Sequence, residues 1–220
     1  MRARFLLLLA AAMVLAAQAP NPAYAPVQDD PALPRVLLIG DSISIGYTVP
    51  VRKMLAGKAN VHRPATNSAH TRKGLEELDQ WLGTGRWEVI HFNWGLHDLK
   101  RMEKGEHQVP LEEYSKNMAA LVARLKKTKA RLIWASTTPV PEGKLNPPRV
   151  PADVDAYNAA ALAIMKKNKV AVDDLYAFAK PKLGEIQRPV NVHFTNEGSE
   201  ALGREVVASI TAELAKVKRK

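Results

Sequence analysis

The sequence has no cysteine among its 220 residues, and only 6% of the residues are aromatic. The lack of cysteine excludes thiolate catalysis, thiol redox chemistry and cysteine-based metal sites, as well as a small fold held together by disulfides. The basic residues are not interleaved with aromatic ones and no nucleic-acid-binding motif is present, so no nucleic-acid partner is expected. With 46% hydrophobic residues, the chain is long enough to bury the core of one ordinary domain.

Negative charge is also scarce, because 22 acidic residues face 32 Lys and Arg, which gives a formal net charge of +10. Such a balance favours anionic surfaces or polyanions. Many of the cations, however, cluster at expected helix ends, as at Arg124 and Lys127, or near the C-terminus from Lys216 to Lys220. Most of the positive excess is therefore interpreted as a solvated surface.

One long hydrophobic run is present at residues 5–17, directly after Arg2 and Arg4. A positive start and a short apolar middle predict a secretory signal peptide over residues 1–25, followed by a linker over 26–33 and a single domain over 34–220. Two small-residue sequences, ending at Ala19 and at Ala25, could be the cleavage site, and an uncleaved anchor is the alternative. Export to a bacterial periplasm or secretion is expected, without a stable membrane anchor.

Short apolar runs alternate with amphipathic helical stretches from Pro34 onward. This pattern predicts an α/β fold of three layers, α/β/α, with a central, mostly parallel five-stranded sheet. Strands are expected at 36–39, 60–63, 89–92, 132–135 and 170–172. Helices are expected at 48–55, around 75–82, from just after Pro110, at 153–167, near Tyr176 and at 196–217, the last capped by Thr195. Five prolines between residues 139 and 151 predict an extended surface loop near the strand ends.

Polar side chains follow three of these strands, where parallel sheets bind ligands. Gly40-Asp41-Ser42 comes directly after the first strand and places a serine at the start of a helix, where free N–H groups stabilise negative charge. Ser44 stands where the nucleophile elbow of α/β-hydrolases has its second glycine, and no dinucleotide or phosphate-loop spacing is present. A simple helix cap is the alternative interpretation of Ser42.

The segments 93–98 and 191–195 could bring further polar groups to the same edge. His193 precedes the last helix and could take a proton from a serine hydroxyl, because the pKa of histidine lies near neutrality. His97 and Asp98 could instead be a solvated histidine and a turn cap. The six histidines are scattered without an H-E-x-x-H pattern, so neither a metal nor another cofactor is expected.

Together these segments resemble the SGNH (GDSL-type) serine hydrolases over nearly the whole expected mature chain. The resemblance implies a flavodoxin-like sheet, a Ser42 nucleophile and a His193 base. It also implies an oxyanion hole formed by the N–H groups of Ser42 and Ala69 and by the side chain of His97.

The sequence departs from the family pattern at three places. Ala69 replaces a glycine, and His97 replaces the asparagine of G-x-N-D, so that Gly95-Leu96-His97-Asp98 resembles a carbohydrate-esterase-like branch. Val190 stands where the family has the aspartate that orients the histidine, which leaves Asn191 or a backbone carbonyl for that role. Supporting roles are expected for Asp41, Asn67, Asp98 and Asn191. Substrate contacts are expected for His70, Arg149 and Tyr157, with surface charge and a helix stripe as the alternatives for Arg149 and Tyr157.

The sequence thus predicts an exported serine esterase that hydrolyses small acyl esters, acetyl above all, on carbohydrate. The expected partner is a small-molecule or glycan ester, and the oligomeric state stays open. A periplasmic thioesterase or lysophospholipase is an alternative, which a long lipophilic channel would favour. The other alternative is a binding protein that has kept the fold and lost catalytic activity, since the three departures from the family pattern are changes that a decayed site would show.

Overall fold

The computed structural model describes residues 20–217 and contains a central sheet of five strands in the order β2-β1-β3-β4-β5. All neighbouring strands are parallel, which confirms the expected fold class. The strands are β1 (Arg35–Ile39), β2 (Asn60–His62), β3 (Val89–Phe92), β4 (Arg131–Ala135) and β5 (Ala171–Asp173). The central strands β1, β3 and β4 are almost entirely buried because helices cover the sheet on both faces, which explains their uninterrupted apolar sequences.

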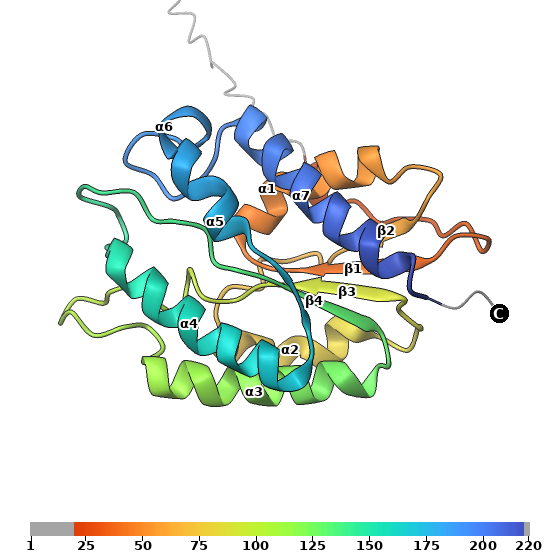
Figure 1. The fold of residues 1–220 in the computed structure, drawn as a ribbon, viewed down its shortest axis with the longest axis horizontal. Coiled ribbons are helices and arrows are strands. Elements are labelled where there is room, and N and C mark those ends of the chain that lie inside the picture. Colours follow the sequence, from red (N-terminus) through yellow and green to blue (C-terminus); the bar gives the residue numbers. More distant parts are fainter. Residues whose placement is uncertain (1–19, 218–220) are drawn as a thin grey trace, which may run out of the picture.

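Helices form two layers around this sheet (Figure 1). Helices α1 (Ser42–Met54) and α7 (Asn196–Leu214) pack together on one face, while α2 (Thr71–Leu82), α3 (Leu111–Lys127) and α4 (Pro151–Asn168) cover the other. The shorter elements are η1 (Pro22–Tyr24), α5 (Leu175–Ala179), η2 (Lys180–Lys182) and α6 (Leu183–Ile186). The order of the strands reverses between β1 and β3, and the loops after these two strands therefore flank the crevice where such sheets bind ligands.

Helix α1 begins six residues before the start predicted from sequence, at Ser42 instead of residue 48. Asp41 caps it, because its Oδ1 accepts the backbone N–H of Ile43 at 2.9 Å. Pro50 lies inside this helix, where it cannot donate a backbone hydrogen bond. The burial of Tyr47 and Val51 against the core offsets that loss.

The proline-rich segment after β4 is a surface loop, as expected. It contains no helix or strand from residue 139 to 150, and most of its residues are exposed. The buried side chains of Val140, Leu145 and Arg149 attach it to the domain. The short elements η2 and α6 have no counterpart in the sequence prediction.

Residues 1–19 of the predicted leader lie outside the described range. Residues 20–33, which were assigned to the end of the leader and the linker, lie against the domain. Ala23 is buried, and the guanidinium of Arg52 donates to the carbonyl of Pro22 at 3.1 Å. The side chain of Asn60 in β2 exchanges hydrogen bonds with the backbone of Asp30. Within residues 20–217 we find no helix with the length and apolarity needed to span a membrane.

Gly198 in the first turn of α7 has no room for a side chain. An added Cβ would lie 2.0 Å from the carbonyl oxygen of Ile186, which accepts the N–H of Thr195. We expect Gly198→Ala to lower the free energy of unfolding by about 2–3 kcal/mol, because either the helix or the loop must shift. Urea denaturation measures this change. Gly184→Ala is the control, since an added Cβ there meets no atom within 4 Å, and equal losses in both variants would contradict the prediction.

Candidate active site

Ser42 is the first residue of α1 and follows β1 through the turn Gly40-Asp41. Its backbone N–H lies in the first turn of the helix and has no hydrogen-bond partner among the described residues. The buried carboxyl of Asp41 stabilises this turn by capping the helix. Ser42 therefore combines a half-buried hydroxyl with a free donor at a positive helix end.

The structure brings Ser42 and His193 together although 151 positions separate them in the chain. The Oγ of Ser42 and the Nε2 of His193 lie 2.8 Å apart. On the far side of the ring, Nδ1 lies 2.7 Å from Oδ1 of Asn191. Val190, at the family's acid position, is exposed, and Asn191 takes its place behind the imidazole.

The hydrogen bonds of Asn191 determine which nitrogen of His193 carries the proton. The backbone N–H of His193 donates to the same Oδ1 atom at 2.9 Å, and since a backbone N–H can only donate, this atom must be the amide oxygen. The oxygen has no proton to give, so Nδ1 must be the protonated nitrogen. The Nε2 lone pair then faces the hydroxyl of Ser42, as a general base requires.

The electrostatic surroundings keep this imidazole neutral near pH 7. Burial lowers the pKa of His193 below its usual 6.5, and the guanidinium groups of Arg188 and Arg149 lower it further, while the carboxyl of Asp41 acts in the opposite direction. Burial in turn raises the pKa of Asp41, although the N–H of Ile43 favours its charged form. His193 is therefore ready to accept a proton at neutral pH.

The expected oxyanion donor Ala69 is strained and already engaged. Its φ of 47° lies in the left-handed region, where a residue other than glycine loses about 1–2 kcal/mol. Its N–H donates to Oδ1 of Asn67 at 2.9 Å. Asn67 therefore competes with a bound oxyanion for this donor, and Ala69 becomes available only when that side chain releases it.

His97, the second unusual donor, lies half-buried in the loop after β3. This loop requires a glycine at position 95, because φ there is 150° and an added Cβ would lie 2.2 Å from Oγ1 of Thr137. Burial lowers the pKa of His97 to about 4, and the nearby charges of Lys100 and Arg149 act in the same direction. The ring is therefore neutral and carries one N–H, which has no partner among the described residues.

Hydrogen bonds connect the loops that carry these groups. The N–H of Ser68 donates to the carbonyl of Gly40 at 3.2 Å, and the indole of Trp94 donates to the carbonyl of Ser68 at 3.3 Å. Oδ1 of Asp98 accepts from both the N–H and the hydroxyl of Thr71, at the start of α2. Burial raises the pKa of Asp98 to about 7. Asp98 thus fixes the loop of His97 against the loop of Ala69.

Arg63 is a site residue that the sequence reasoning did not identify. It lies just after β2, is buried, and donates to the carbonyl of Gly40 at 3.2 Å and to the hydroxyl of Thr48 at 2.9 Å. Its position at the carboxyl end of a strand was the only signal in the sequence. The guanidinium supports the turn that carries Ser42 from behind.

The three expected substrate contacts have different outcomes. The expectation that Tyr157 contacts substrate is wrong. Its side chain is buried in the core beside Tyr114, and its hydroxyl donates to the carbonyl of Val109, so it faces away from the site. Arg149 lies next to the site, but its Nε donates to the carbonyl of Leu96 at 2.8 Å and it is largely buried. His70 caps α2 by accepting the N–H of Lys73, and its role toward substrate stays a prediction.

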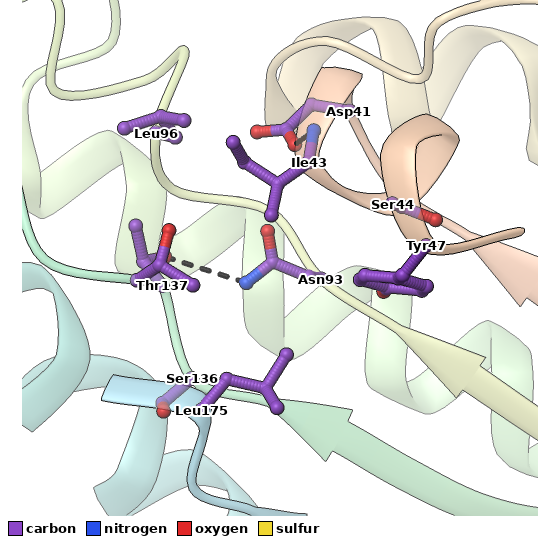
Figure 2. Close-up of a pocket in the computed structure, with 10 residues that line it drawn as sticks. Asp41, Ile43, Ser44, Tyr47, Asn93, Leu96, Ser136, Thr137 and Leu175 are labelled. Carbon is purple, nitrogen blue, oxygen red and sulfur yellow. Dashed lines mark hydrogen bonds between the residues drawn. The ribbon is translucent and has the colours of Figure 1, made fainter. Parts of the chain in front are cut away.

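Two hollows adjoin the nucleophile turn. A groove of about 280 Å³ contains Ser42 and His193 and is otherwise lined by Ile43, Ile45, Gly46, Arg188, Phe194, Asn196 and Ser199. A cavity of about 10 Å³ lies beneath the turn at the ends of β1, β3 and β4, with space for roughly one water molecule. Asn93 points across this cavity toward Thr137 (Figure 2) and donates to the carbonyl of Ala135 at 2.7 Å.

Within residues 20–217, no group of three or more His, Asp or Glu side chains is arranged to hold a metal ion. The chemistry that the described groups offer is nucleophilic attack by a hydroxyl with an adjacent base and nearby N–H donors.

Comparisons with known proteins agree with this arrangement. A sequence profile of the GDSL-like lipase/acylhydrolase family matches residues 38–201. The fold is similar to a lipase/acylhydrolase from Enterococcus faecalis, with a TM-score of 0.70, 20% identity, and coverage of 85% of this chain and 98% of that one. A search of curated proteins found no match.

Two similar structures are described as acetyl xylan esterases. One, AlAXEase, has a TM-score of 0.69 and 14% identity over 80% of this chain and 99% of that one. The other, Axe2 from Geobacillus stearothermophilus, has a TM-score of 0.66 and 17% identity over 85% and 97%. At these identities the likeness is one of fold, whereas the family profile spans most of the sequence. The chain belongs to the GDSL-like lipase/acylhydrolase family and is a carboxylic ester hydrolase.

Proposed function

We propose that this hydrolase is an exported esterase that removes acetyl groups from carbohydrate esters, with Ser42 as nucleophile and His193 as base. The observation that carries the proposal is the continuous chain of hydrogen bonds from Ser42 Oγ through the His193 imidazole to Asn191 Oδ1, at 2.8 and 2.7 Å. Asn191 is a positioning residue that replaces the missing aspartate.

In the reaction, Ser42 Oγ attacks the ester carbonyl while Nε2 of His193 removes the hydroxyl proton. The oxyanion that forms accepts hydrogen bonds from the N–H of Ser42 and the neutral imidazole of His97, and from Ala69 once Asn67 releases it. Each such donor can contribute about 3 kcal/mol to the stability of the transition state. His193 then protonates the leaving alcohol, and water repeats the cycle to release acetate.

The size of the hollows supports a short acyl group. The cavity beneath the nucleophile turn has about 10 Å³ and is crossed by Asn93, so it offers no depth for a long chain. The neighbouring groove mixes apolar residues with Arg188, Asn196 and Ser199. A long acyl chain would need continuous apolar walls to gain binding energy from burial.

The carbohydrate part of the proposal rests on the alcohol side of the ester. The polar lining of the groove suits a hydroxyl-rich alcohol, and the Gly95-Leu96-His97-Asp98 sequence resembles the carbohydrate-esterase-like branch. The two acetyl xylan esterases among the similar folds support the same substrate class.

A series of 4-nitrophenyl esters from acetate to octanoate tests the acyl part. We expect kcat/KM to be highest for acetate and to fall at least about tenfold by octanoate, because added methylenes find no matching pocket. In parallel, a fluorophosphonate should leave its adduct on Ser42, located by peptide mass spectrometry. A preference for octanoate would favour the thioesterase or lysophospholipase alternative, and an unlabelled Ser42 would count against the nucleophile.

Export belongs to the same proposal and is supported by the charged start and apolar run of residues 2–17. Cleavage after Ala19 would preserve the buried Ala23 and the ring of Tyr24, whose centroid lies 5.5 Å from the guanidinium carbon of Arg63. Cleavage after Ala25 would remove both. Protein recovered from a bacterial periplasm should therefore retain Ala23 and Tyr24, as read from the mass of the N-terminal peptide, and a start at Pro26 or Met1 would contradict cleavage ahead of these residues.

A further inference from the structure

Positive side chains surround the Ser42–His193 pair. Arg188 lies on the side of His193, and Lys100 and Arg149 lie on the side of His97. In the described part of the chain, none of the three makes an ion pair with a carboxylate, whereas many exposed lysines and arginines elsewhere do. The carboxyl of Asp41 offsets part of the charge of Arg149, whereas Arg188 and Lys100 carry positive charge that no ion pair within residues 20–217 neutralises.

Arg188 is the one lysine or arginine among the described residues that line the groove of Ser42 and His193. Its backbone N–H donates to the carbonyl of His193 at 2.9 Å, and its Nε donates to the carbonyl of Phe194 at 3.1 Å. These bonds hold the side chain against the groove and leave the two outer nitrogens without a partner among the described residues. A planar guanidinium held in this way suits a carboxylate or phosphate group.

Lys100 and Arg149 extend the positive field to the other side of the site. Lys100 follows His97 in the same turn, its N–H donating to the carbonyl of His97 at 3.3 Å, while Arg149 is fixed to the carbonyl of Leu96. Burial lowers the pKa of Lys100, and the like charge of Arg149 lowers it further. An anion bound near these two neighbouring cations would reduce their mutual repulsion.

We propose that the natural substrate is an acyl ester of an acidic carbohydrate, with Arg188 binding a negative group on the alcohol side of the ester. This inference rests on the proposed function and narrows its substrate class. Lys100 and Arg149 add to the positive potential that attracts the anion. The negative group is either a carboxylate, as on a uronic acid, or a phosphate, because both present the oxygen pair that a guanidinium binds.

Matched pairs of aryl acetates test the proposal in the full-length mature enzyme. The carboxylate pair is 4-acetoxybenzoate and its neutral methyl ester, and the phosphate pair is 4-acetoxyphenyl phosphate and the neutral 4-methoxyphenyl acetate. We compare wild type with Arg188→Gln and with Lys58→Gln. The control removes the same charge from an exposed site just before β2, at the amino end of that strand and therefore at the edge of the sheet opposite the groove. Each substrate is compared between enzymes, so differences in ester reactivity cancel.

In Arg188→Gln we expect the KM of at least one anionic ester to rise about fivefold relative to its neutral partner, the effect of about 1 kcal/mol from an accessible ion pair. Arg188→Lys should restore part of this difference, and about 0.5 M NaCl should reduce it in wild type because salt screens exposed charges. A response confined to one pair identifies the carboxylate or the phosphate as the bound group.

Two results would overturn the inference. One is an equal change for anionic and neutral esters in Arg188→Gln. The other is the same shift in Lys58→Gln, since that would assign the effect to net charge alone. Either result leaves the proposed function intact as long as the hydrolysis of neutral acetates still depends on Ser42. Loss of that dependence would instead remove the proposed function itself.

Discussion

Replacing Ser42 with alanine is expected to reduce kcat/KM for 4-nitrophenyl acetate by ~10⁴-fold or more, because covalent catalysis by the Ser42 hydroxyl is lost and only binding and oxyanion donors remain. The hydroxyl lies 2.8 Å from Nε2 of His193, and alanine leaves that nitrogen without a proton to remove. His193→Ala should cause a loss of similar size, and the double variant should lose little more, since the pair acts as one unit.

Circular dichroism and urea denaturation of Ser42→Ala should match the wild type, because the removed oxygen is half-buried at the surface of the groove. Ser115→Ala in α3 is the control: its hydroxyl bonds only to the carbonyl of Leu111 and should not affect turnover. If Ser42→Ala hydrolysed acetate esters as fast as this control, a different nucleophile would have to be sought.

Asn191→Ala is expected to lower kcat by at least about 10²-fold, and by less than the ~10⁴-fold that enforcing the wrong histidine tautomer costs. Without Oδ1, the ring of His193 loses the acceptor 2.7 Å from Nδ1 and is free to rotate or to place its proton on Nε2. Asn168→Ala, which removes an amide at the distant end of α4, should leave kcat unchanged. Equal kcat values for the two variants would contradict the positioning role.

Asn191→Asp provides the opposite test. A carboxylate can accept the same two hydrogen bonds, and its charge stabilises the imidazolium that forms during attack, so kcat at pH 8 should rise by up to about tenfold. The charge must also raise the pKa of His193 from its lowered wild-type position. Because the neutral ring is the active base, the acid limb of the pH profile of kcat/KM should move to higher pH. A limb that stays or moves down would contradict this account.

The sequence predicts the strands, their parallel direction and the meeting of the loops at one edge, because these follow from hydrophobic runs and from the common edge where parallel strands end. It predicts where His193 lies, but it cannot choose between Asn191 and a backbone carbonyl as the acceptor, since that depends on side-chain rotamers. For the same reason the sequence does not predict that the N–H of Ala69 is already hydrogen-bonded, because the side chain of Asn67 reaches it only in the folded loop.

Tyr157 and Arg63 show the other limit of such reasoning. Tyr157 flanks the proline-rich loop in sequence, yet helix α4 turns it into the core, and only the packing against α3 decides this. Arg63 is buried, and no carboxylate among residues 20–217 forms an ion pair with it, an arrangement that residue preferences disfavour. It is stable there because carbonyl and hydroxyl oxygens from several segments converge on its guanidinium.

Both outer strands of the sheet, β2 and β5, are only three residues long. The side-chain amide of Asn60 in β2 also donates to the carbonyls of Asp30 and Leu33, which places this segment beside the strand. An outer strand is where foreign chains add themselves by continuing the ladder, and short or covered strands offer too few free backbone groups for a stable addition. Short outer strands therefore disfavour edge-to-edge association of the sheets of neighbouring molecules at high protein concentration.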